Sequence, residues 1–592
     1  MTPSVNPTLE CNLVLEGGVT SGVVYPSLVE ELARTYRLRC VGGTSAGAIA
    51  ASLAAAAELG RQTGQGGFAR LLNAADWLAT SEVQGGPLNL QRLFQPQATT
   101  AATFELLSRA NDENRAWTLP LEVMRRQPLA ALAGSVPGVA LLRSSWRTRD
   151  VGGLLWSSGV ALAGGVLGAL LARASDAKRA FEDNHFGLCN GFTGGVPSSV
   201  PPLSAWLTDM LDNVAGRDVN GEPLTFQDLL GEGVDLQMIT TCLAHGRPYR
   251  LPFAHSDRFY FNEREFRALF PTRVVNFMMR HPRPVKSGDV ASARRRGFFA
   301  ARGVFPLPSA ELLPVVVAVR LSLSFPGLIS AVPLYGADFT QTASPMGDRE
   351  PKRAYFSDGG LTSNFPVHLF DPPLPERPTF AVNLRPYPDG RQPHEDEAQN
   401  VWMPEGNNKG IQPTWTTVEG LPEFTVNLVD TARNWNDGVY VQAPSYRDRM
   451  VHVFMSKHEG GLNLGMTAET VRKLMARGRA AGTLAVQRFE AQGGWNRHRR
   501  ARLVTLMAAI EEFASAFQKE YDRELEADAR SWLDVAASAD LGYRLSQSQQ
   551  KTLMTLINTL KDAAMSSDTS GGTLQDKRTP RPRLALKLRP EV

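Results

Sequence analysis

The sequence predicts an α/β fold in which helices pack on a largely parallel sheet. Three observations support this prediction. Strand-like and helical segments alternate over residues 10–60, and further apolar, strand-like segments occur at 233–246 and 378–387. The composition is that of a globular protein, with 43% hydrophobic and 21% charged residues. A chain of 592 residues is long enough to bury a large core and to contain more than one domain.

Each element of the first sixty residues has a local reason. CNLVLEGG at 11–18 is a short apolar strand ended by glycines. Apolar residues recur at helical spacing over 22–36, with charged residues between them. LRCVGG at 38–43 is a second strand, and the alanine-rich segment 45–60 is a helix that ends at Gly60.

The later chain divides by composition. Residues 311–328 form an apolar helix or strand that leads into a proline turn, and 386–422, rich in Pro, Gly and Asn, are expected to form a long loop. Residues 466–565 are expected to be helical, with a capping box at Ser546. The basic, proline-rich tail 566–592 is expected to be disordered.

An uncharged segment occurs inside the apolar region 127–172. Residues 151–172 carry no charge over a length that could cross a bilayer, and Gly164 and Gly168 have GxxxG spacing. Two interpretations stay open: a membrane-inserting helix or hairpin, and a glycine-rich buried helix or apolar loop of a large enzyme.

The net charge of +4 is small for this length and does not indicate a nucleic-acid-binding protein. Basic residues gather at 273–302, which holds eight Lys/Arg and one acid, Asp289, with three arginines shortly before Phe298 and Phe299. Basic residues beside aromatic ones suit an anionic membrane surface, and a solvated helix face is the alternative.

The cysteines and the N-terminus point to the cytoplasm. No cysteine lies in a CxxC or Cys/His cluster, so neither a metal site nor a disulfide framework is indicated, and we expect reduced, mostly buried thiols. The N-terminal residues lack the pattern of a secretory signal. The four cysteines are Cys11, Cys40, Cys189 and Cys242.

A serine surrounded by small residues follows the second predicted strand. Gly43-Thr44-Ser45-Ala46-Gly47 is a GxSxG pentapeptide between a strand and a helix. Such a turn exposes the serine hydroxyl, needs small neighbours and directs a helix N-terminus at the site, which favours developing negative charge. A simple tight turn would account for the same residues.

A second glycine-rich loop, EGGVTSG at 16–22, follows the first strand. Its backbone amides can bind an oxyanion because no side chains obstruct them. Parallel strands would bring this loop and Ser45 to the same edge of the sheet, where ligand sites form. A glycine turn without function is the alternative.

An aspartate far downstream completes the pattern. Asp358, in YFSDGGLTSNFPV at 355–367, follows an apolar and aromatic segment and precedes two glycines. An aspartate at a strand end could accept the proton of Ser45, although Asp-Gly is also a common turn dipeptide.

The three motifs in this order resemble those of the patatin-like phospholipases, and so do LSFPGLISAVPLY at 323–335, Asn364 and Pro366. The resemblance covers residues 10–60 and 320–385 firmly. It implies a three-layer α/β/α sandwich with a mainly parallel central sheet at 1–465, followed by the helical region.

The resemblance also implies the chemistry: a serine lipid acyl hydrolase of phospholipase A type that acts on membrane phospholipids and uses no metal or other cofactor. Ser45 would be the nucleophile and Asp358 the base of a Ser-Asp dyad, with an acyl-enzyme intermediate. Peripheral attachment to the membrane, through 127–172 or 273–302, would follow. The remaining residues implied are the oxyanion hole, Gly17, Gly18 and Val19, and the glycines that support the motifs, Gly22, Gly43, Gly47, Gly359 and Gly360.

Two departures from the family pattern leave alternatives open. Val19 stands where the family usually has a glycine, and Ser21 where it usually has a basic residue. These departures motivate a catalytically silent relative that binds lipid or a partner protein. An acyltransferase is a third hypothesis, and the helices at 466–565 leave packing on the core, oligomer formation and reception of an activating signal open.

A Ser-Asp-His hydrolase is the competing mechanism, and it needs a histidine after the aspartate. The early serine and the preceding glycine loop argue against it. Of the candidates, only His368 is expected to lie near the site. The histidines that follow Asp358 are His368, His394, His452, His458 and His498.

Overall fold

The structure is a computed structural model of the chain. It describes residues 7–18, 21–83, 86–110, 175–194, 198–254, 258–340, 349–388, 390–406, 420–456, 466–491, 493–523, 531–537 and 545–570, with a few isolated positions besides. Apart from Ser135 and Val136, the apolar region 127–172 lies outside the described residues. In the part of the chain that the structure describes, no helix is both long and apolar enough to cross a bilayer.

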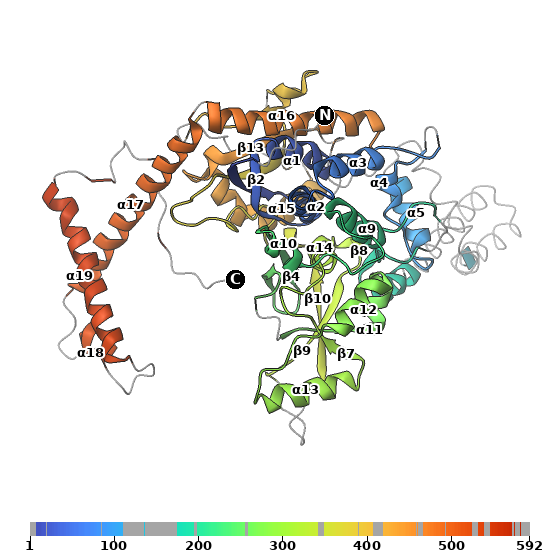
Figure 1. Cartoon of the computed structure of the whole chain (residues 1–592), viewed down its shortest axis with the longest axis horizontal. Helices are drawn as coiled ribbons and strands as arrows, with labels where there is room; N and C mark the ends of the chain where they lie inside the picture. The colour runs from blue at the N-terminus through green and yellow to red at the C-terminus, as the bar shows by residue number, and fades with distance from the viewer. Residues whose placement is uncertain are drawn as a thin grey trace, which may run out of the picture.

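Five parallel strands form the centre of the sheet, in the order β13-β11-β1-β2-β4. Their central residues are buried, as expected for strands covered on both faces. The predicted α/β fold with a parallel central sheet is therefore confirmed (Figure 1). These strands are β1 (Leu9–Leu15), β2 (Tyr36–Gly43), β4 (Asp235–Cys242), β11 (Thr379–Pro386) and β13 (Met450–Met455).

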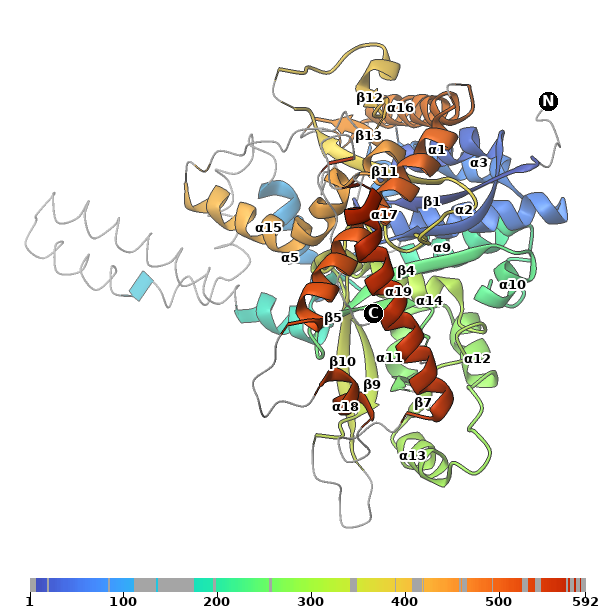
Figure 2. The ribbon, with the colours of Figure 1, turned by 90° about the vertical axis from the view of Figure 1, so that its left-hand side faces the viewer.

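Antiparallel strands extend this sheet on the β4 side in the order β10-β9-β6-β7, while β5 pairs with β4 and β12 with β13. In Figure 2 the long strands β9 and β10 run downward from the parallel centre. A separate two-stranded sheet joins β3 to β8. The bounds are β3 (Gly187–Cys189), β5 (Arg247–Leu251), β6 (Tyr260–Asn262), β7 (Val304–Pro306), β8 (Gly327–Ile329), β9 (Val332–Ala337), β10 (Pro351–Ser357) and β12 (Val401–Trp402).

Alternate residues of the central strands face two different cores. Leu13 and Leu15 of β1 belong to the large core that contains the helices α1, α2, α9 and α14, whereas Val14 packs with residues of 365–370 and with Tyr440. The sheet thus has a layer on each face. The helices of these layers are α1 (Tyr25–Ala33), α2 (Ala46–Thr63), α9 (Leu203–Ala215), α14 (Val315–Leu323), α15 (Leu421–Gln442) and α16 (Ala468–Val486).

The apolar segment 311–328, for which the sequence allowed either a helix or a strand, contains the helix α14. Its β-branched residues disfavour a helix by propensity, but every residue of α14 is buried, so packing decides the structure. Smaller helices surround these layers: α3 (Phe68–Leu78), α4 (Asn89–Arg92), α5 (Ala101–Ala110), α10 (Phe226–Gly231), α11 (Glu263–Leu269), α12 (Thr272–Arg280) and α13 (Val290–Ala300).

The predicted loop 386–422 is mostly irregular where it is described, but it also holds a 3-10 turn at Glu397–Asn400 and the edge strand β12. The expected long loop therefore includes one short turn of helix and one short strand. β12 exists because it pairs with the exposed side of β13, a partner about fifty residues away.

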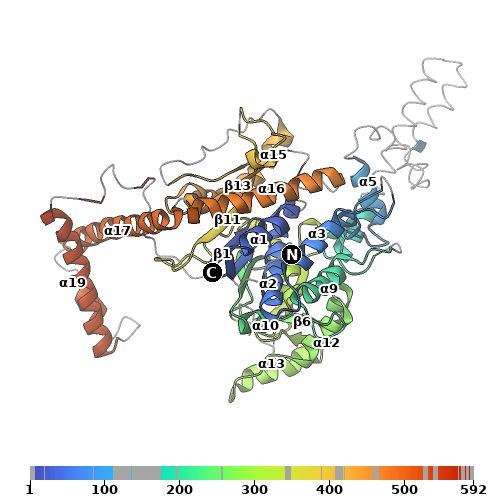
Figure 3. The same ribbon diagram turned by 45° about the horizontal axis from the view of Figure 1, so that its top comes forward.

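Helices follow the α/β body from Ala468, as predicted. α17 (Gly494–Tyr521) and α19 (Gln547–Ser570) cross as a long projecting pair (Figures 1 and 3), with the short α18 (Trp532–Ala537) between them in sequence. The capping box is confirmed, because Ser546 N donates to Gln549 Oε1 at 2.8 Å and Gln549 N to Ser546 Oγ at 3.3 Å. The predicted limit at 565 was wrong by five residues, since α19 continues to Ser570 before a pair of glycines.

Gly478 allows α16 to lie directly against α1. A Cβ atom at this position would lie 2.0 Å from the carbonyl oxygen of Val24. We expect Gly478→Ala to lower the free energy of unfolding by about 1–3 kcal/mol because the helices must separate. Gly297→Ala is the matched control: its Cβ would meet nothing within 4 Å, so it should be neutral or slightly stabilising. Thermal melts compare the two variants, and equal melting temperatures would contradict the packing described here.

Candidate active site

Ser45 lies between β2 and α2 in a conformation that few non-glycine residues adopt. Its φ is 54° and its ψ is −129°, and the residue is only 2% exposed. A backbone of this kind costs of order 1–3 kcal/mol, so the surrounding structure must hold it in place. One support is the Ser45 N–H, which donates to Ser322 Oγ of α14 at 3.2 Å. The strain presents the hydroxyl at the N-terminus of α2.

The glycines of the pentapeptide are sterically required. A Cβ at Gly43 would lie 2.3 Å from the carbonyl oxygen of Gly47, and a Cβ at Gly47 would lie 2.4 Å from that of Leu15. The turn between β2 and α2 therefore packs directly on the end of β1. This agrees with the sequence argument that side chains would clash here.

Asp358 lies at the end of β10 and meets Ser45 directly. Ser45 Oγ donates to Asp358 Oδ2 at 2.6 Å, and Asp358 is 2% exposed. The other carboxylate oxygen accepts from the N–H of Gly360 at 2.6 Å. A Cβ at Gly359 would lie 1.9 Å from the carbonyl oxygen of Ile239, so only glycine fits there. Two predicted site residues from loops 313 positions apart in sequence are thus in contact.

The loop after β1 contains the predicted oxyanion hole. The N–H of Gly17 donates to the carbonyl oxygen of Asn364 at 3.0 Å, so this amide is engaged within the protein. Gly18 is half-buried beside it, and Val19 lies outside the described residues. A Cβ at Gly22 would make an ordinary contact, at 3.5 Å from the Cβ of Ala46, so Gly22 is not sterically required.

Asn364 joins the three site loops, although the sequence argument gave it no role. Its carbonyl oxygen accepts from Gly17 N and, at 2.8 Å, from Thr44 Oγ1. Its side-chain amide donates to Glu16 Oε1 at 3.1 Å and to the carbonyl oxygen of Gly17 at 3.3 Å. Asn364 stands in the DGGLTSNFPV motif, so the motif was the signal that could have identified it.

Glu16 fixes the loop after β1 to the neighbouring strand. Its Oε2 accepts from Asn383 Nδ2 at 2.8 Å and from the N–H of Leu384 at 2.6 Å. Its carbonyl oxygen accepts from the Tyr25 hydroxyl at 2.6 Å. Burial raises the pKa of Tyr25 well above its ordinary value, with Glu16 adding to the rise, so the phenol remains a donor.

The histidines do not stand between Ser45 and Asp358, because those two side chains are hydrogen-bonded to each other. His368 stacks on Tyr440, with ring centroids 5.8 Å apart. His452 pairs with Asn383 Oδ1 at 3.0 Å. Burial, together with the charge of Arg385, lowers the pKa of His452 to about 3, so the ring is neutral near pH 7.

An apolar cavity begins next to Ser45. Ala46, Ile49, Ala50 and Leu53 line it from one face of α2, and residues of α1, α3 and α9 form its other walls. Its volume is about 80 Å³, and the described residues that line it include no charged one. Trp206, which stacks on Trp77, forms part of the cavity wall. A narrow apolar space of this kind suits a hydrocarbon chain.

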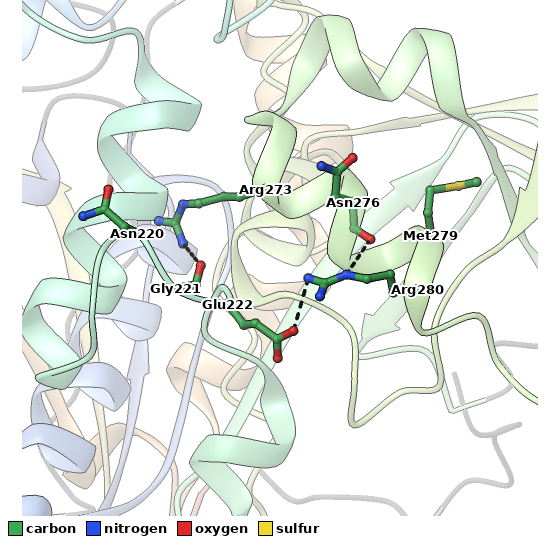
Figure 4. Close-up of a pocket in the computed structure, with 7 residues that line it drawn as sticks. All are labelled: Asn220, Gly221, Glu222, Arg273, Asn276, Met279 and Arg280. Carbon is green, nitrogen blue, oxygen red and sulfur yellow. Dashed lines mark hydrogen bonds and ion pairs between the residues drawn. The ribbon is translucent and has the colours of Figure 1, made fainter.

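A second cavity, of about 540 Å³, contains none of the predicted site residues (Figure 4). Its two cations are engaged within the protein: Arg280 pairs with Glu222 at 3.1 Å, and Arg273 with Asp212 at 2.6 Å. Both arginines belong to the basic segment 273–302. The cavity is lined by Asn220, Gly221, Glu222, Arg273, Asn276, Met279 and Arg280.

Comparison with known proteins decides the family. The model of the family described as patatin-like phospholipase matches residues 13–150. The chain is also 35% identical over 555 residues to a protein of Rhizobium meliloti (strain 1021) named RpoH suppressor, covering 80% of this chain and 82% of that protein. This chain belongs to the patatin-like phospholipase family. Among solved structures, VipD of Legionella pneumophila aligns over 95% of this patatin-like chain and 86% of its own, with 11% identity and a TM-score of 0.27.

The packing around Gly17 gives a test of this patatin-like site. A Cβ at Gly17 would lie 2.6 Å from Asn364 Oδ1 and 2.9 Å from the Cβ of Ser45. We expect Gly17→Ala to reduce ester hydrolysis by roughly 10²-fold or more, because the loop must move away from Ser45. Gly231→Ala, whose Cβ would meet nothing within 4 Å, is the control. The site geometry is contradicted if Gly17→Ala, folded by circular dichroism, keeps the activity of the control.

Proposed function

We propose that this protein is a serine lipid acyl hydrolase of phospholipase A type, with Ser45 as nucleophile and Asp358 as base. The observation that carries the proposal is the 2.6 Å hydrogen bond between Ser45 Oγ and Asp358 Oδ2 in a buried site at the N-terminus of α2. Family membership supports lipid ester hydrolysis, and the adjoining apolar cavity supports an acyl chain as the group that is bound.

The proposed reaction begins when Ser45 Oγ attacks the ester carbonyl carbon and its proton passes to Asp358 Oδ2. The tetrahedral oxyanion is held by backbone amides of the loop after β1. Because the N–H of Gly17 is engaged with Asn364, the proposal assigns this role to the amides of Gly18 and Val19. The partial positive charge at the start of α2 also stabilises the oxyanion.

Collapse of the intermediate breaks the ester bond, and the proton on Asp358 passes to the leaving alcohol. The fatty acyl group then remains on Ser45 as an ester. In the second half, water attacks this ester while Asp358 takes one of its protons, and that proton returns to Ser45 Oγ as the fatty acid leaves. The step needs no histidine, which agrees with direct contact between the two side chains. Attachment to membranes through 127–172 or 273–302 stays a prediction.

Fatty-acid release from mixed phospholipid vesicles tests the function. Wild type should release fatty acid, whereas Ser45→Ala and Asp358→Ala should lose roughly 10³-fold or more of the rate, because each removes one half of the proton-transfer pair. Circular dichroism checks that both variants fold. Equal release by wild type and Ser45→Ala would contradict the proposal, and no release by wild type would favour a silent lipid- or partner-binding relative.

The apolar cavity next to Ser45 leads to a second prediction, which concerns the length of the acyl chain that the enzyme prefers. Ala50 lies about 6 Å along α2 from Ala46, at a rise of about 1.5 Å per residue. We expect Ala50→Leu to fill the cavity at that depth and to lower the ratio of kcat/KM for long-chain to short-chain esters by about tenfold. Competition between palmitoyl and butyryl esters measures the ratio. An unchanged ratio would show that the acyl chain lies elsewhere.

A further inference from the structure

The helix α15 carries an exposed apolar stripe. Leu421, Phe424, Leu428 and Val439 are 77%, 53%, 59% and 60% exposed. At 3.6 residues per turn these four positions fall within about 60° of one another and extend over about 27 Å of the helix. We call these four residues the α15 stripe. Large apolar side chains exposed singly are ordinary, but four aligned on one helix face mark an interaction surface.

The opposite side of α15 is bonded to the loop that follows Asp358. Asp437, which is 4% exposed, accepts a hydrogen bond from Ser363 Oγ at 3.1 Å and one from the N–H of Phe365 at 2.8 Å. Tyr440 stacks on His368 one turn further on. The helix therefore has one face that packs on the active-site loop and one that faces away from it, at the edge of the body in Figure 2.

The loop that Asp437 holds is part of the site itself. Between Ser363 and Phe365 lies Asn364, which accepts from Gly17 N and Thr44 Oγ1. A surface that binds the α15 stripe would thus lie one helix away from the loops around Ser45. Since Ser45 is only 2% exposed, an acyl ester must reach it from a surface close to these loops.

We propose that the α15 stripe docks on the surface of a zwitterionic phospholipid bilayer, from which the site draws its substrate. The choice of a lipid surface rests on the proposed function. Charge decides which lipid: even without the buried Asp437, the sequence of α15 holds no excess of basic over acidic residues, so the helix does not favour anionic lipid. Insertion of apolar side chains from a helix lying in the interface supplies the affinity.

The test measures co-sedimentation with phosphatidylcholine vesicles in the Ser45→Ala background, so that binding does not depend on chemistry. The test variant is Phe424→Ser with Leu428→Ser. The matched control is Leu503→Ser with Leu556→Ser, which removes two apolar residues exposed by 47% and 57% on α17 and α19. We expect the test variant to bind at least about tenfold more weakly and the control to bind as the parent does.

Salt separates this surface from the basic segment 273–302. Binding through the α15 stripe should stay within about twofold at about 0.5 M salt, because apolar insertion is not screened. Binding that needs anionic lipid and disappears in salt would overturn the proposal in favour of the basic segment. Unchanged binding of the test variant would overturn it as well, and a changed oligomeric state with unchanged vesicle binding would assign the stripe to a second copy of the chain.

The same variants, with Ser45 restored, keep the two proposals distinguishable. The ratio of vesicle hydrolysis to hydrolysis of a soluble short-chain ester should fall at least about tenfold in the Phe424→Ser and Leu428→Ser protein. A protein that binds vesicles through the stripe but cleaves neither ester contradicts the proposed function and leaves the docking surface standing. A protein that cleaves both at an unchanged ratio contradicts the docking surface alone.

Discussion

The hydrogen bond between Ser45 and Asp358 is the contact on which the rest of the site depends. It joins the turn at Ser45 to the turn at Asp358, 313 residues later. Both turns must therefore lie at the same edge of the sheet. The parallel pairing of β1, β2 and β4 and the antiparallel pairing of β10 with β4 provide that edge. The strained backbone of Ser45 persists because Gly43 and Gly47 let the turn pack on the end of β1.

A second set of contacts fixes the loop after β1 relative to that pair. Glu16 binds the end of β11 through Asn383 and Leu384, while Asn364 binds Gly17 and Thr44. These bonds fix the loop with the N–H of Gly17 donating to the carbonyl oxygen of Asn364. The amides proposed to hold an oxyanion are therefore those further along the loop. Attachment of Asn364's neighbours to Asp437 extends the same network to α15.

Much of the site was predictable because its residues follow local rules. A glycine-flanked serine after a strand predicts the turn at Ser45, and the family resemblance that the ordered motifs carry implies its meeting with Asp358. The antiparallel strands β6, β7 and β9 were not predicted, because they pair with distant segments, and β10 was expected only as a strand that ends at Asp358. α15 and Asp437 were missed for a related reason. The carboxylate of Asp437 accepts a hydrogen bond from a loop more than seventy residues earlier, and no local pattern reveals that contact. The hydrogen bond that the N–H of Gly17 makes within the protein was also missed, because it depends on a tertiary contact.

Covalent labelling of the wild-type protein with a fluorophosphonate, followed by mass spectrometry of its peptides, tests the central claim most directly. A phosphonylated serine reports an activated nucleophile without reference to any lipid substrate. The account predicts a single modified residue, Ser45, and labelling slowed by roughly 10²-fold or more in Asp358→Asn, where the base can no longer take the proton. An unlabelled protein, a label on another serine, or equal labelling rates in the two proteins would contradict it.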